Sequence, residues 1–501
     1  MPEPRFPGIV LALLAPDIVI KAPGTRRRFV ERLRANLEDA LARNRVPHET
    51  VLRGTRFLVR TPDPEAAASV LRHVFGIATV AVVEAVARAE LEDIVRVGAE
   101  RFRQAVAGRR FAVRAKKLER HPFSTQEIER ALGAPLARAG TVDLTNPDVT
   151  VHVELSGGEA FLFTRRRPGA GGLPAGVQGR AVALVSGGFD SAVAAWRIMR
   201  RGAEMHYVYC NLGGSAHERM VLQVVKVLHE LWGFGLRPRL HVLDFVPLVE
   251  ELRRRTGATL WQMVLKVLFY RAAAAVARME RADVVVTGEA VGQVSSQTLP
   301  NLATLDRFAE VPVLRPLCGY DKSEIVAEAR RVGTAPLSER IPEMCGLARA
   351  KPAVNARVGV LQREVDKLDP ELLERAVRER RVIRVHEVTA ADLRTDYLFV
   401  DDIPEDAVVI DCREPELYRI WHVPGAINIP VAQLVETFRR LDRGRRYVLY
   451  CTFGTQTPLL AELMQQAGFE AYAFRGGIRA VERAVARRED AALAGEGEAG
   501  P

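Results

Sequence analysis

The spacing of apolar and polar positions changes along the chain. In the first third, short apolar runs such as 56–61 and 148–155 alternate with stretches of helical periodicity such as 26–43. This order predicts a mixed α+β region. From residue 180 onward, strand-like and helix-like segments alternate regularly. That pattern predicts a doubly wound parallel sheet and, further on, a second and smaller α/β unit.

Two segments separate these regions. Residues 165–179, RRRPGAGGLPAGVQG, contain too much glycine and proline for a helix or a strand, and they mark the first boundary. Residues 351–400 are rich in charge and carry a helical pattern, which predicts a connector before the smaller unit. The terminal stretch AALAGEGEAGP is typical of a disordered tail.

Composition places the chain among soluble, multidomain proteins. Its 501 residues are 48% hydrophobic and 27% charged, which is enough for roughly two to four packed domains. No apolar run approaches the roughly 18 residues that span a bilayer, and no basic leader with a cleavage site precedes the first apolar run. We therefore expect a cytoplasmic protein with no membrane partner.

The net charge of +10 is concentrated near the N-terminus. Residues 1–179 contain 28 lysines and arginines against 20 acidic residues, a difference of +8, and residues 101–120 alone contain eight basic residues and one acidic residue. A charge run is usually a solvated face, but an excess this large and local favours a polyanionic partner such as nucleic acid. Arg114, Lys116 and Lys117 lie in this run and are the predicted RNA-binding residues.

The stretch SGGFDS at 186–191 joins a predicted strand to a predicted helix. Glycines in such a turn let backbone N–H groups approach phosphate oxygens, and the helix N-terminus adds a partial positive charge there. The hydroxyls of Ser186 and Ser191 are further donors, and Asp190 is a candidate ligand of Mg²⁺. The alternative is an ordinary strand-to-helix turn in which Asp190 or Ser191 caps the helix.

A second segment downstream fits the same nucleotide site. TGEAVGQVSSQTLPNL begins directly after a predicted buried strand, where doubly wound sheets bind their ligands. Gly288 would allow close approach of a nucleotide, and Gln293 and Gln297 would supply amide hydrogen bonds. Lys266, on an otherwise apolar helix, is interpreted as a phosphate ligand; the alternative is a surface lysine whose stem packs on apolar neighbours. The predicted nucleotide-binding set comprises Leu184, Val185, Ser186, Gly187, Gly188, Asp190, Ser191, Lys266, Gly288 and Gln297.

The cysteines do not form a metal-binding pattern. Cys210, Cys318, Cys345, Cys412 and Cys451 include no closely spaced pair, so no metal cluster is predicted. Cys451 follows a predicted strand and precedes a glycine and a predicted helix, whose N-terminus would stabilise a thiolate; a buried, inert cysteine is the alternative. Cys345 lies in a turn flanked by proline and glycine, which an ordinary turn cysteine explains equally well.

Longer motifs are similar to those of known families. SGGFDS after the first strand of a doubly wound sheet resembles the PP-loop pyrophosphatases, which cleave ATP to AMP and pyrophosphate and adenylate a carbonyl oxygen. This resemblance implies ATP and Mg²⁺ as cofactors and a catalytic role for Asp190. VVIDCREPELYRIWHVPGAINIP and FRGG resemble the rhodanese pattern, in which the loop cysteine, here Cys451, carries a persulfide. The pattern residues are Asp411, Arg413, Glu416, His422, Gly425, Ala426, Asn428 and Pro430.

The order of these parts resembles the tRNA uridine 4-sulfurtransferase family over nearly the whole chain. PDIVIKAPGTRRRF, LRHVFGI and VDLTNPDVTVHVEL are similar to its N-terminal domains, and NLGGSAHE, LRPLCGYDK and PEMCG to its PP-loop domain. The resemblance implies a ferredoxin-like domain at 1–63, a THUMP RNA-binding domain at 64–168, a PP-loop adenylation domain at 169–350, a charged connector at 351–400, a rhodanese domain at 401–488 and a disordered tail at 489–501.

The function implied by this resemblance is ATP-dependent replacement of the C4 oxygen of the uridine at tRNA position 8 by sulfur, which gives 4-thiouridine. Cys451 would receive sulfur from a cysteine desulfurase and form a disulfide with Cys345 as the sulfur leaves. The thiazole-synthesis sulfur carrier protein of thiamine biosynthesis is a second implied acceptor. Three alternatives remain open: another PP-loop tRNA thiolase or ligase, an RNA-binding protein with a degenerate nucleotide site, and a sulfur carrier for thiamine synthesis only.

Overall fold

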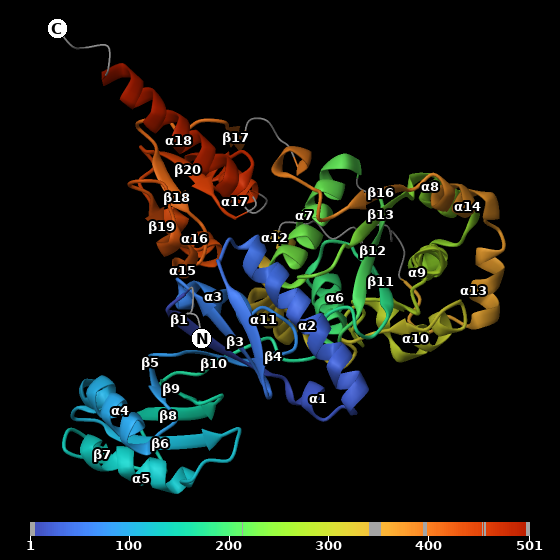
Figure 1. Cartoon of the computed structure of the whole chain (residues 1–501). Helices are drawn as coiled ribbons and strands as arrows, with labels where there is room; N and C mark the ends of the chain where they lie inside the picture. The colour runs from blue at the N-terminus through green and yellow to red at the C-terminus, as the bar shows by residue number, and fades with distance from the viewer. Residues whose placement is uncertain are drawn as a thin grey trace. The chain divides into compact units, whose positions relative to one another are not determined.

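The computed structural model describes residues 6–212, 214–339, 352–393, 398–452, 454 and 457–496. The chain forms two compact units, Met1–Pro174 and Ala175–Pro501 (Figure 1). Among the described residues, each unit contains two sheets.

The first sheet of the N-terminal unit is antiparallel and follows the order β10-β4-β1-β3-β2. Its strands are β1 (Gly8–Leu14), β2 (Glu49–Arg53), β3 (Arg56–Thr61), β4 (Ile77–Val82) and β10 (Arg167–Pro168), and its helices are α1 (Pro16–Val19), α2 (Pro23–Arg43) and α3 (Pro64–Leu71). α3 packs against β1 and β4, and α2 packs against α3. Asp63 starts α3 by accepting a hydrogen bond from the Ala66 N–H at 2.9 Å.

The predicted boundary at residue 64 is wrong. α3 and β4 belong to the first sheet, because Val82 pairs with Val10 of β1, and β10 returns to pair with β4 near the end of the unit. The helical run after residue 63 leads into another apolar strand, and that strand completes the sheet begun by β1. The second domain of this unit therefore begins with β5 (Ala85–Arg88).

The second sheet of this unit follows the order β5-β9-β8-β6-β7. Its other elements are α4 (Leu91–Val106), β6 (Arg110–Lys117), α5 (Thr125–Leu136), β7 (Thr141–Val142), β8 (Val149–Ser156) and β9 (Glu159–Phe163). The helices and the sheet enclose a core that includes Phe102, Phe111 and Leu132. A capping box of Ser124 and Glu127 starts α5. β6 pairs with β8 on one side and with β7 on the other, so it is an inner strand. It carries the predicted RNA-binding residues.

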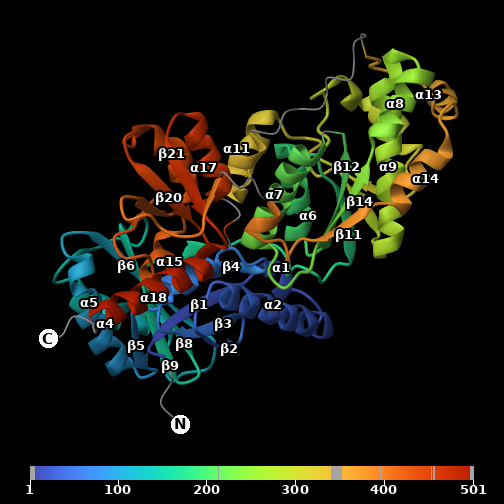
Figure 2. The same ribbon diagram turned by 90° about the horizontal axis from the view of Figure 1, so that it is seen from above.

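The first sheet of the second unit confirms the predicted doubly wound arrangement. It follows the order β15-β14-β11-β12-β13-β16, and its first five strands are parallel. Figure 2 shows α6, α7 and α11 on one face and α8 and α9 on the other. The elements are β11 (Arg180–Leu184), α6 (Phe189–Arg200), β12 (Glu204–Asn211), α7 (Gly214–Trp232), β13 (Arg239–Asp244), α8 (Val246–Arg255), α9 (Trp261–Glu280), β14 (Val284–Val286), α10 (Leu299–Asp306), β15 (Val313–Leu314), α11 (Lys322–Val332) and α12 (Ala335–Ser338).

The segment predicted as a connector is part of this domain over most of its described length. It forms α13 (Val358–Val365), α14 (Pro370–Arg378) and β16 (Arg381–Arg384). Both helices pack against α9, and β16 pairs antiparallel with β13. Leu361, Val365, Ala376 and Val377 are buried in the core beside α9. Sequence reasoning missed this packing because these few apolar residues are dispersed among many charges.

One described helix, Ala258–Glu280, is long and apolar enough to cross a membrane by length and composition. This differs from the expectation that no apolar run would reach that length. In the structure, 61% of its apolar window is buried, because α9 packs against β11, β12 and β14. Packing within the domain therefore accounts for its apolar residues.

The second sheet of this unit confirms the predicted smaller α/β unit. It is parallel, in the order β17-β21-β20-β18-β19. Its elements are β17 (Phe399–Val400), β18 (Val408–Asp411), α15 (Pro415–Ile420), β19 (Ile427–Asn428), α16 (Val431–Thr437), β20 (Arg446–Tyr450), α17 (Thr457–Gln466), β21 (Glu470–Phe474) and α18 (Gly477–Glu496). α18 includes residues 489–496, which were predicted as disordered; good helix formers such as alanine and glutamate explain the difference. Residues 497–501 lie outside the described residues.

Candidate functional site

The loop predicted to bind a nucleotide lies between β11 and α6, at the C-terminal edge of the parallel sheet. Gly187 has a φ of +83°, a conformation that favours glycine, and Gly188 is the N-cap of α6. Ser191 Oγ donates to the Gly188 carbonyl at 3.2 Å and accepts from the Ser186 N–H at 3.4 Å. The serine hydroxyls therefore brace the turn, and its backbone N–H groups and the N-terminus of α6 are the parts suited to phosphate.

Gly288 lets a second loop approach this turn closely. A Cβ atom at residue 288 would lie 2.5 Å from the Asp190 carbonyl carbon and 2.6 Å from the Ser191 nitrogen. The sequence predicted that Gly288 makes room for a nucleotide, whereas in the structure it makes room for the backbone of the nucleotide loop. This contact fixes the loop after β14 against the start of α6.

Side chains from two other elements, α11 and the loop after β14, converge on the carboxylate of Asp190. Lys322 Nζ, in the first turn of α11, lies 2.9 Å and 3.1 Å from its two oxygens, and Gln293 Nε2 donates to Oδ2 at 3.2 Å. A capping box of Asp321 and Glu324 starts α11 and so positions Lys322. Lys322 is not among the predicted site residues, although it ends the motif LRPLCGYDK.

The buried carboxylate of Glu289 ties the loop after β14 to neighbouring elements of the domain. Glu289 forms an ion pair with Lys266, accepts a hydrogen bond from Tyr270 Oη at 2.5 Å and lies 2.9 Å from Arg315 Nε. Burial alone would raise the pKa of Glu289, but the charge and hydrogen bond of Lys266, the Tyr270 hydrogen bond and the Arg315 charge lower it to about 2. Glu289 therefore stays ionised, and it engages Lys266, which was predicted as a phosphate ligand.

The remaining predicted nucleotide-binding residues make contacts within the protein. Gln297 Oε1 accepts a hydrogen bond from the Ala290 N–H at 3.3 Å, which ties the loop after β14 to itself. Leu184 ends β11, and the Val185 N–H donates to the Val208 carbonyl of β12 at 2.9 Å. These three residues hold the two loops at the edge of the sheet.

The chain on either side of Cys345 is anchored near these loops, whereas Cys345 itself lies outside the described residues. Ser338 Oγ donates to the Gly187 carbonyl at 2.9 Å. Beyond Cys345, the Ala353 carbonyl accepts a hydrogen bond from Asn301 Nδ2 of α10 at 2.9 Å. α10 directly follows the loop after β14. Both anchors therefore lie at the end of the domain where the predicted nucleotide-binding loops are found.

Cys451 directly follows β20 and is buried beside a helix N-terminus. Its Sγ lies 4.0 Å from Oγ1 of Thr457, the first residue of α17, and its carbonyl accepts a hydrogen bond from the Ile478 N–H at 3.1 Å. Gly454 has a φ of +75°, and a Cβ there would lie 2.6 Å from the Gly477 nitrogen. The sulfur thus lies beside the first residue of α17, at the positive end of a helix, where a thiolate is favoured.

Other residues of the rhodanese pattern form a separate network. Arg413 Nε donates to the two carboxylate oxygens of Asp411 at 3.0 Å and 3.2 Å. Arg413 also donates to the Trp421 carbonyl at 2.5 Å. Asn428 Nδ2 donates to the carbonyls of Asp411 at 3.0 Å and Arg413 at 2.8 Å. These bonds fix the connection between β18 and β19.

β6 places the predicted RNA-binding residues on two faces of its sheet. Arg114 and Lys116 are exposed on one face. In the neighbouring strand β8, His152 and Glu154 lie directly beside them. Lys117 points to the other face, where its ammonium donates to a backbone carbonyl of the following loop. The structure therefore brings Arg114 and Lys116 together and separates Lys117 from them.

Further cations gather around Glu154. Arg56, from the first sheet of the same unit, forms a buried ion pair with Glu154, and Arg166 Nη2 lies 2.9 Å from the same carboxylate. Burial, followed by the charges of Arg56 and Arg166, lowers the pKa of Lys116. Burial, followed by the charge of Arg166, lowers the pKa of His152 to about 4. Glu154 is thus one carboxylate among several cations. The resulting excess of positive charge is suited to binding the phosphate backbone of a nucleic acid.

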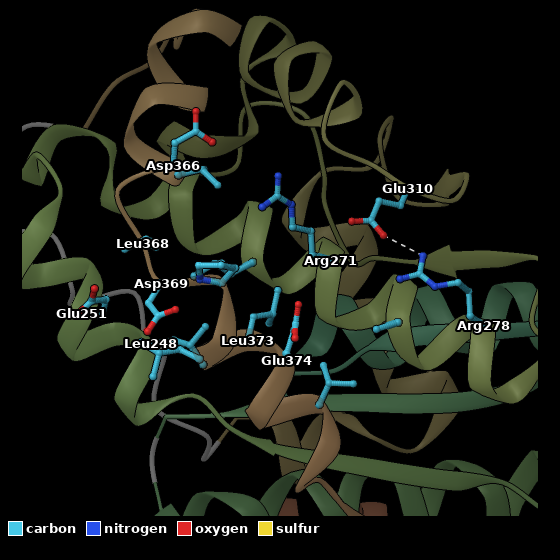
Figure 3. Close-up of a pocket in the computed structure, with 16 residues that line it drawn as sticks. Leu248, Glu251, Arg271, Arg278, Glu310, Asp366, Leu368, Asp369, Leu373 and Glu374 are labelled. Carbon is cyan, nitrogen blue, oxygen red and sulfur yellow. Dashed lines mark hydrogen bonds and ion pairs between the residues drawn. The ribbon is translucent and has the colours of Figure 1, made fainter.

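A cavity of about 470 Å³ lies between α8, α9 and α14, and none of the residues predicted from the sequence lines it (Figure 3). Its walls are largely aliphatic and include Leu248, Leu268 and Leu372. Arg278 at its edge is bound to Glu310 at 2.8 Å. Two arginines and five carboxylates line it together, so its charges do not select one class of ligand.

Three family models match the chain. The model for ThiI, thiamine biosynthesis protein, matches residues 176–369, the THUMP domain model matches 88–165, and the rhodanese-like domain model matches 399–484. The THUMP match begins within β5, at the second sheet of the first unit. The ThiI match extends through α13, which agrees with the packing of that helix on α9.

Two tRNA sulfurtransferases match most of the chain. A tRNA sulfurtransferase of Pyrobaculum aerophilum is 37% identical over 418 residues, which are 82% of this chain and 85% of the relative. A tRNA sulfurtransferase of Desulfurococcus amylolyticus is 36% identical over 473 residues, which are 93% of this chain and 97% of the relative.

Solved structures agree with these matches. The crystal structure of a 4-thiouridine synthetase–RNA complex with bound ATP aligns with a TM-score of 0.67 and 28% identity, covering 75% of this chain and 99% of that chain. PH1313 from Pyrococcus horikoshii aligns with a TM-score of 0.52 and 24% identity over 65% of this chain and all of that chain, and it shows the fold alone.

The fold and the two loops define a multidomain sulfurtransferase that combines THUMP, PP-loop and rhodanese-like domains. The relatives make the assignment more specific. The chain belongs to the tRNA sulfurtransferase family, and it is an enzyme.

Replacing Gly288 with alanine should weaken nucleotide binding, because the added methyl group would collide with the Asp190–Ser191 backbone and push the two loops apart. We expect the affinity for ATP, measured by isothermal titration calorimetry, to fall at least about tenfold, or roughly 1.4 kcal/mol. Gly319→Ala is the matched control, because a Cβ at Gly319 would contact nothing within 4 Å. Equal affinities of the two variants would contradict the role of Gly288.

Proposed function

We propose that this enzyme adenylates the uridine at position 8 of tRNA with ATP and replaces its C4 oxygen with sulfur, giving 4-thiouridine. The observation that carries the proposal is the convergence of Lys322 and Gln293 on Asp190 at the edge of the parallel sheet, in a chain that also contains the Cys451 loop. The names of the relatives and the RNA- and ATP-bound 4-thiouridine synthetase support it. An RNA-binding protein with a degenerate nucleotide site would not need this set of contacts.

The nucleotide loop is proposed to bind the phosphates of ATP. The backbone N–H groups of residues 186–188 and the N-terminus of α6 would bind the pyrophosphate portion. Lys322 would exchange the Asp190 carboxylate for a phosphate oxygen, since its ammonium is a compact charge on a flexible stem. Asp190 would then hold Mg²⁺ together with phosphate oxygens, a set of hard donors that this ion prefers. When bound, the ion would neutralise charge on the pyrophosphate.

The reaction is proposed to comprise two displacements. The uridine C4 oxygen attacks the α-phosphorus of ATP, a P–O bond forms, and pyrophosphate leaves. The oxygen is then part of a good leaving group. The terminal sulfur of a persulfide on Cys451 attacks C4, and AMP departs with the oxygen. ATP is consumed because a carbonyl oxygen is otherwise a poor leaving group.

Release of the sulfur from Cys451 requires a second thiol. Once the terminal sulfur is bonded to C4, Cys345 attacks Sγ of Cys451, the S–S bond to the terminal sulfur breaks, and a Cys345–Cys451 disulfide forms. In the sequence, Cys345 is seven residues from Ser338 and eight from Ala353, and both of these residues are bound near the predicted nucleotide loops. This closeness in sequence supports its role. A cysteine desulfurase is the proposed persulfide donor.

Most of the predicted connector is proposed to stay in place when Cys451 approaches Cys345. Its described part is packed up to Leu393, which is buried, and the Val385 N–H donates to the Pro238 carbonyl at 3.1 Å. A swing of residues 358–384 would break this packing.

The tRNA is proposed to bind the cations around Glu154 through its phosphates. Arg114 and Lys116 are exposed beside Arg166, and their charges are only partly offset by the one carboxylate. Contacts to phosphates position the RNA without reading its sequence. The shape of the folded tRNA would then select the uridine.

The description of the family model at residues 176–369 favours a second acceptor. A sulfur carrier protein whose C-terminal carboxylate has been adenylated presents the same chemistry as the uridine, namely an activated carbon with AMP as the leaving group. We propose the thiazole-synthesis sulfur carrier protein as an alternative substrate of the same two loops.

Asp190→Asn should abolish pyrophosphate release and tRNA thiolation, because the amide keeps the size of the side chain and removes its charge. We expect a loss of at least about 100-fold, or roughly 2.7 kcal/mol of transition-state stabilisation, in a coupled pyrophosphate assay and by mass spectrometry of tRNA nucleosides. Glu310→Gln, which alters an exposed ion pair with Arg278, should keep full activity. Thiolation by Asp190→Asn at the normal rate would refute the assignment.

The triple variant Arg114→Glu, Lys116→Glu, Lys117→Glu should bind tRNA more weakly with unchanged affinity for ATP. Each lost phosphate contact should lower the slope of log affinity against log salt by about 0.7–0.9, measured by fluorescence anisotropy. Because Lys117 lies on the other face, the double variant at Arg114 and Lys116 should reproduce most of the loss. Binding that does not depend on salt would argue against this surface.

Cysteine variants test the sulfur relay. Cys451→Ala should lose both the persulfide and tRNA thiolation. Cys345→Ala should still accept sulfur on Cys451 but stall before the thiolated tRNA is released and so fail in multiple turnover. Cys210→Ala, Cys318→Ala and Cys412→Ala should remain active. Peptide mapping after one turnover without reductant should find a Cys345–Cys451 disulfide. Normal multiple turnover by Cys345→Ala would return Cys345 to an ordinary turn cysteine.

A further inference from the structure

Two cysteines lie side by side in the small parallel sheet. Asp411 of β18 is paired with Tyr450 of β20, and the Cys412 N–H donates to the Tyr450 carbonyl at 2.8 Å. The next position in each strand therefore places Cys412 beside Cys451. Neighbouring strands are about 4.8 Å apart, and a disulfide requires Cα atoms roughly 4.4–6.8 Å apart. The spacing of the strands meets this requirement.

Both side chains point to the same side of the sheet. Cys412 and Cys451 belong to one buried cluster, whereas Tyr450, the residue before Cys451, belongs to the cluster on the opposite face. This follows from the alternation of side chains along a strand. Burial, followed by the charge of Cys451, raises the pKa of the Cys412 thiol, as expected for two sulfur atoms that are close together.

The two thiols differ in reactivity. Cys451 lies at the N-terminus of α17, beside Thr457, where a thiolate is favoured. Cys412 lies within the core, with Sγ 3.8 Å from the Ile410 carbonyl, and its raised pKa keeps it protonated. A reactive thiol with a second thiol beside it is the arrangement found in cysteines that respond to oxidants.

We propose that Cys412 is a resolving thiol that protects Cys451 from peroxides. The Cys451 thiolate attacks a peroxide, so that an S–O bond forms, the O–O bond breaks, and a sulfenic acid and hydroxide result. The sulfur of Cys412 then attacks the sulfur of Cys451. An S–S bond forms, the S–O bond breaks, and water leaves with the proton of Cys412. The two thiols lose two electrons, and hydrogen peroxide is reduced to two molecules of water.

The disulfide stops sulfur transfer reversibly. While bonded to Cys412, Cys451 cannot receive a persulfide or form a disulfide with Cys345, and it is protected from irreversible oxidation to a sulfinic acid. Exchange with a dithiol restores both thiols. This inference rests on the proposed reactivity of Cys451.

The test treats full-length Cys345→Ala with hydrogen peroxide, so that Cys345 cannot compete. Non-reducing peptide mapping should find a Cys412–Cys451 disulfide, which dithiothreitol removes. With Cys412→Ala added, the cross-link should be lost, and Cys451 should gain two oxygen atoms that dithiothreitol does not remove. Cys210→Ala in place of Cys412→Ala is the matched control, because Cys210 is also buried but lies on β12; it should keep the cross-link.

The possible outcomes separate this inference from the proposed function. Cys412→Val should behave like Cys412→Ala, and an unchanged melting temperature would show that the sheet is intact. Equal protection of Cys451 with and without Cys412, or a Cys451 that stays reduced, would overturn the proposal. Loading of Cys451 with a persulfide is measured separately in each variant. Normal loading without a cross-link refutes only the role of Cys412, whereas failure of Cys451 to load in every variant refutes the proposed function.

Discussion

The close approach of two loops at the edge of the parallel sheet is the constraint on which the candidate site depends. Because Gly288 lacks a Cβ atom, the backbone of Asp190 and Ser191 packs directly on the loop after β14. That packing brings Gln293 within hydrogen-bond distance of Asp190. A side chain at residue 288 would separate the loops before any ligand entered. The glycine therefore determines the position of the charged groups around it.

The buried charges behind these loops restrict the site further. Glu289 is almost fully buried, and removing a carboxylate from water is costly unless cations and donors surround it. Lys266, Tyr270 and Arg315 supply them from α9 and from the chain after β15. Loss of one partner would weaken the compensation of the buried Glu289 charge. The network thus holds the loop after β14 in one arrangement.

Local patterns predicted the elements, whereas the partners of those elements could not be predicted. The alternation of strand-like and helix-like segments predicted the parallel sheet, and the glycines around Gly187 predicted the turn. Each of these patterns spans only a few neighbouring residues. Lys322 is 132 residues from Asp190, and no periodicity connects them.

The sequence also did not show which sheet each strand joins. β4 and β16 look like ordinary short strands, and only pairing with β1 and β13 assigns them to their sheets. Their apolar residues show that a strand forms, but they do not show which neighbour it joins. This is why one domain boundary and the connector were predicted wrongly.

The proposed nucleotide binding and the proposed sulfur transfer make opposite demands on the chain. The predicted nucleotide loops are fixed by their contacts, but the proposed relay requires Cys451 to reach Cys345 and then withdraw. The described part of the predicted connector cannot supply this movement without losing its packing, because α13 and α14 pack against α9 and β16 pairs with β13. The two demands therefore fall on different domains: Asp190 and Gly288 lie at the edge of the larger parallel sheet, whereas Cys451 lies in the rhodanese-like domain.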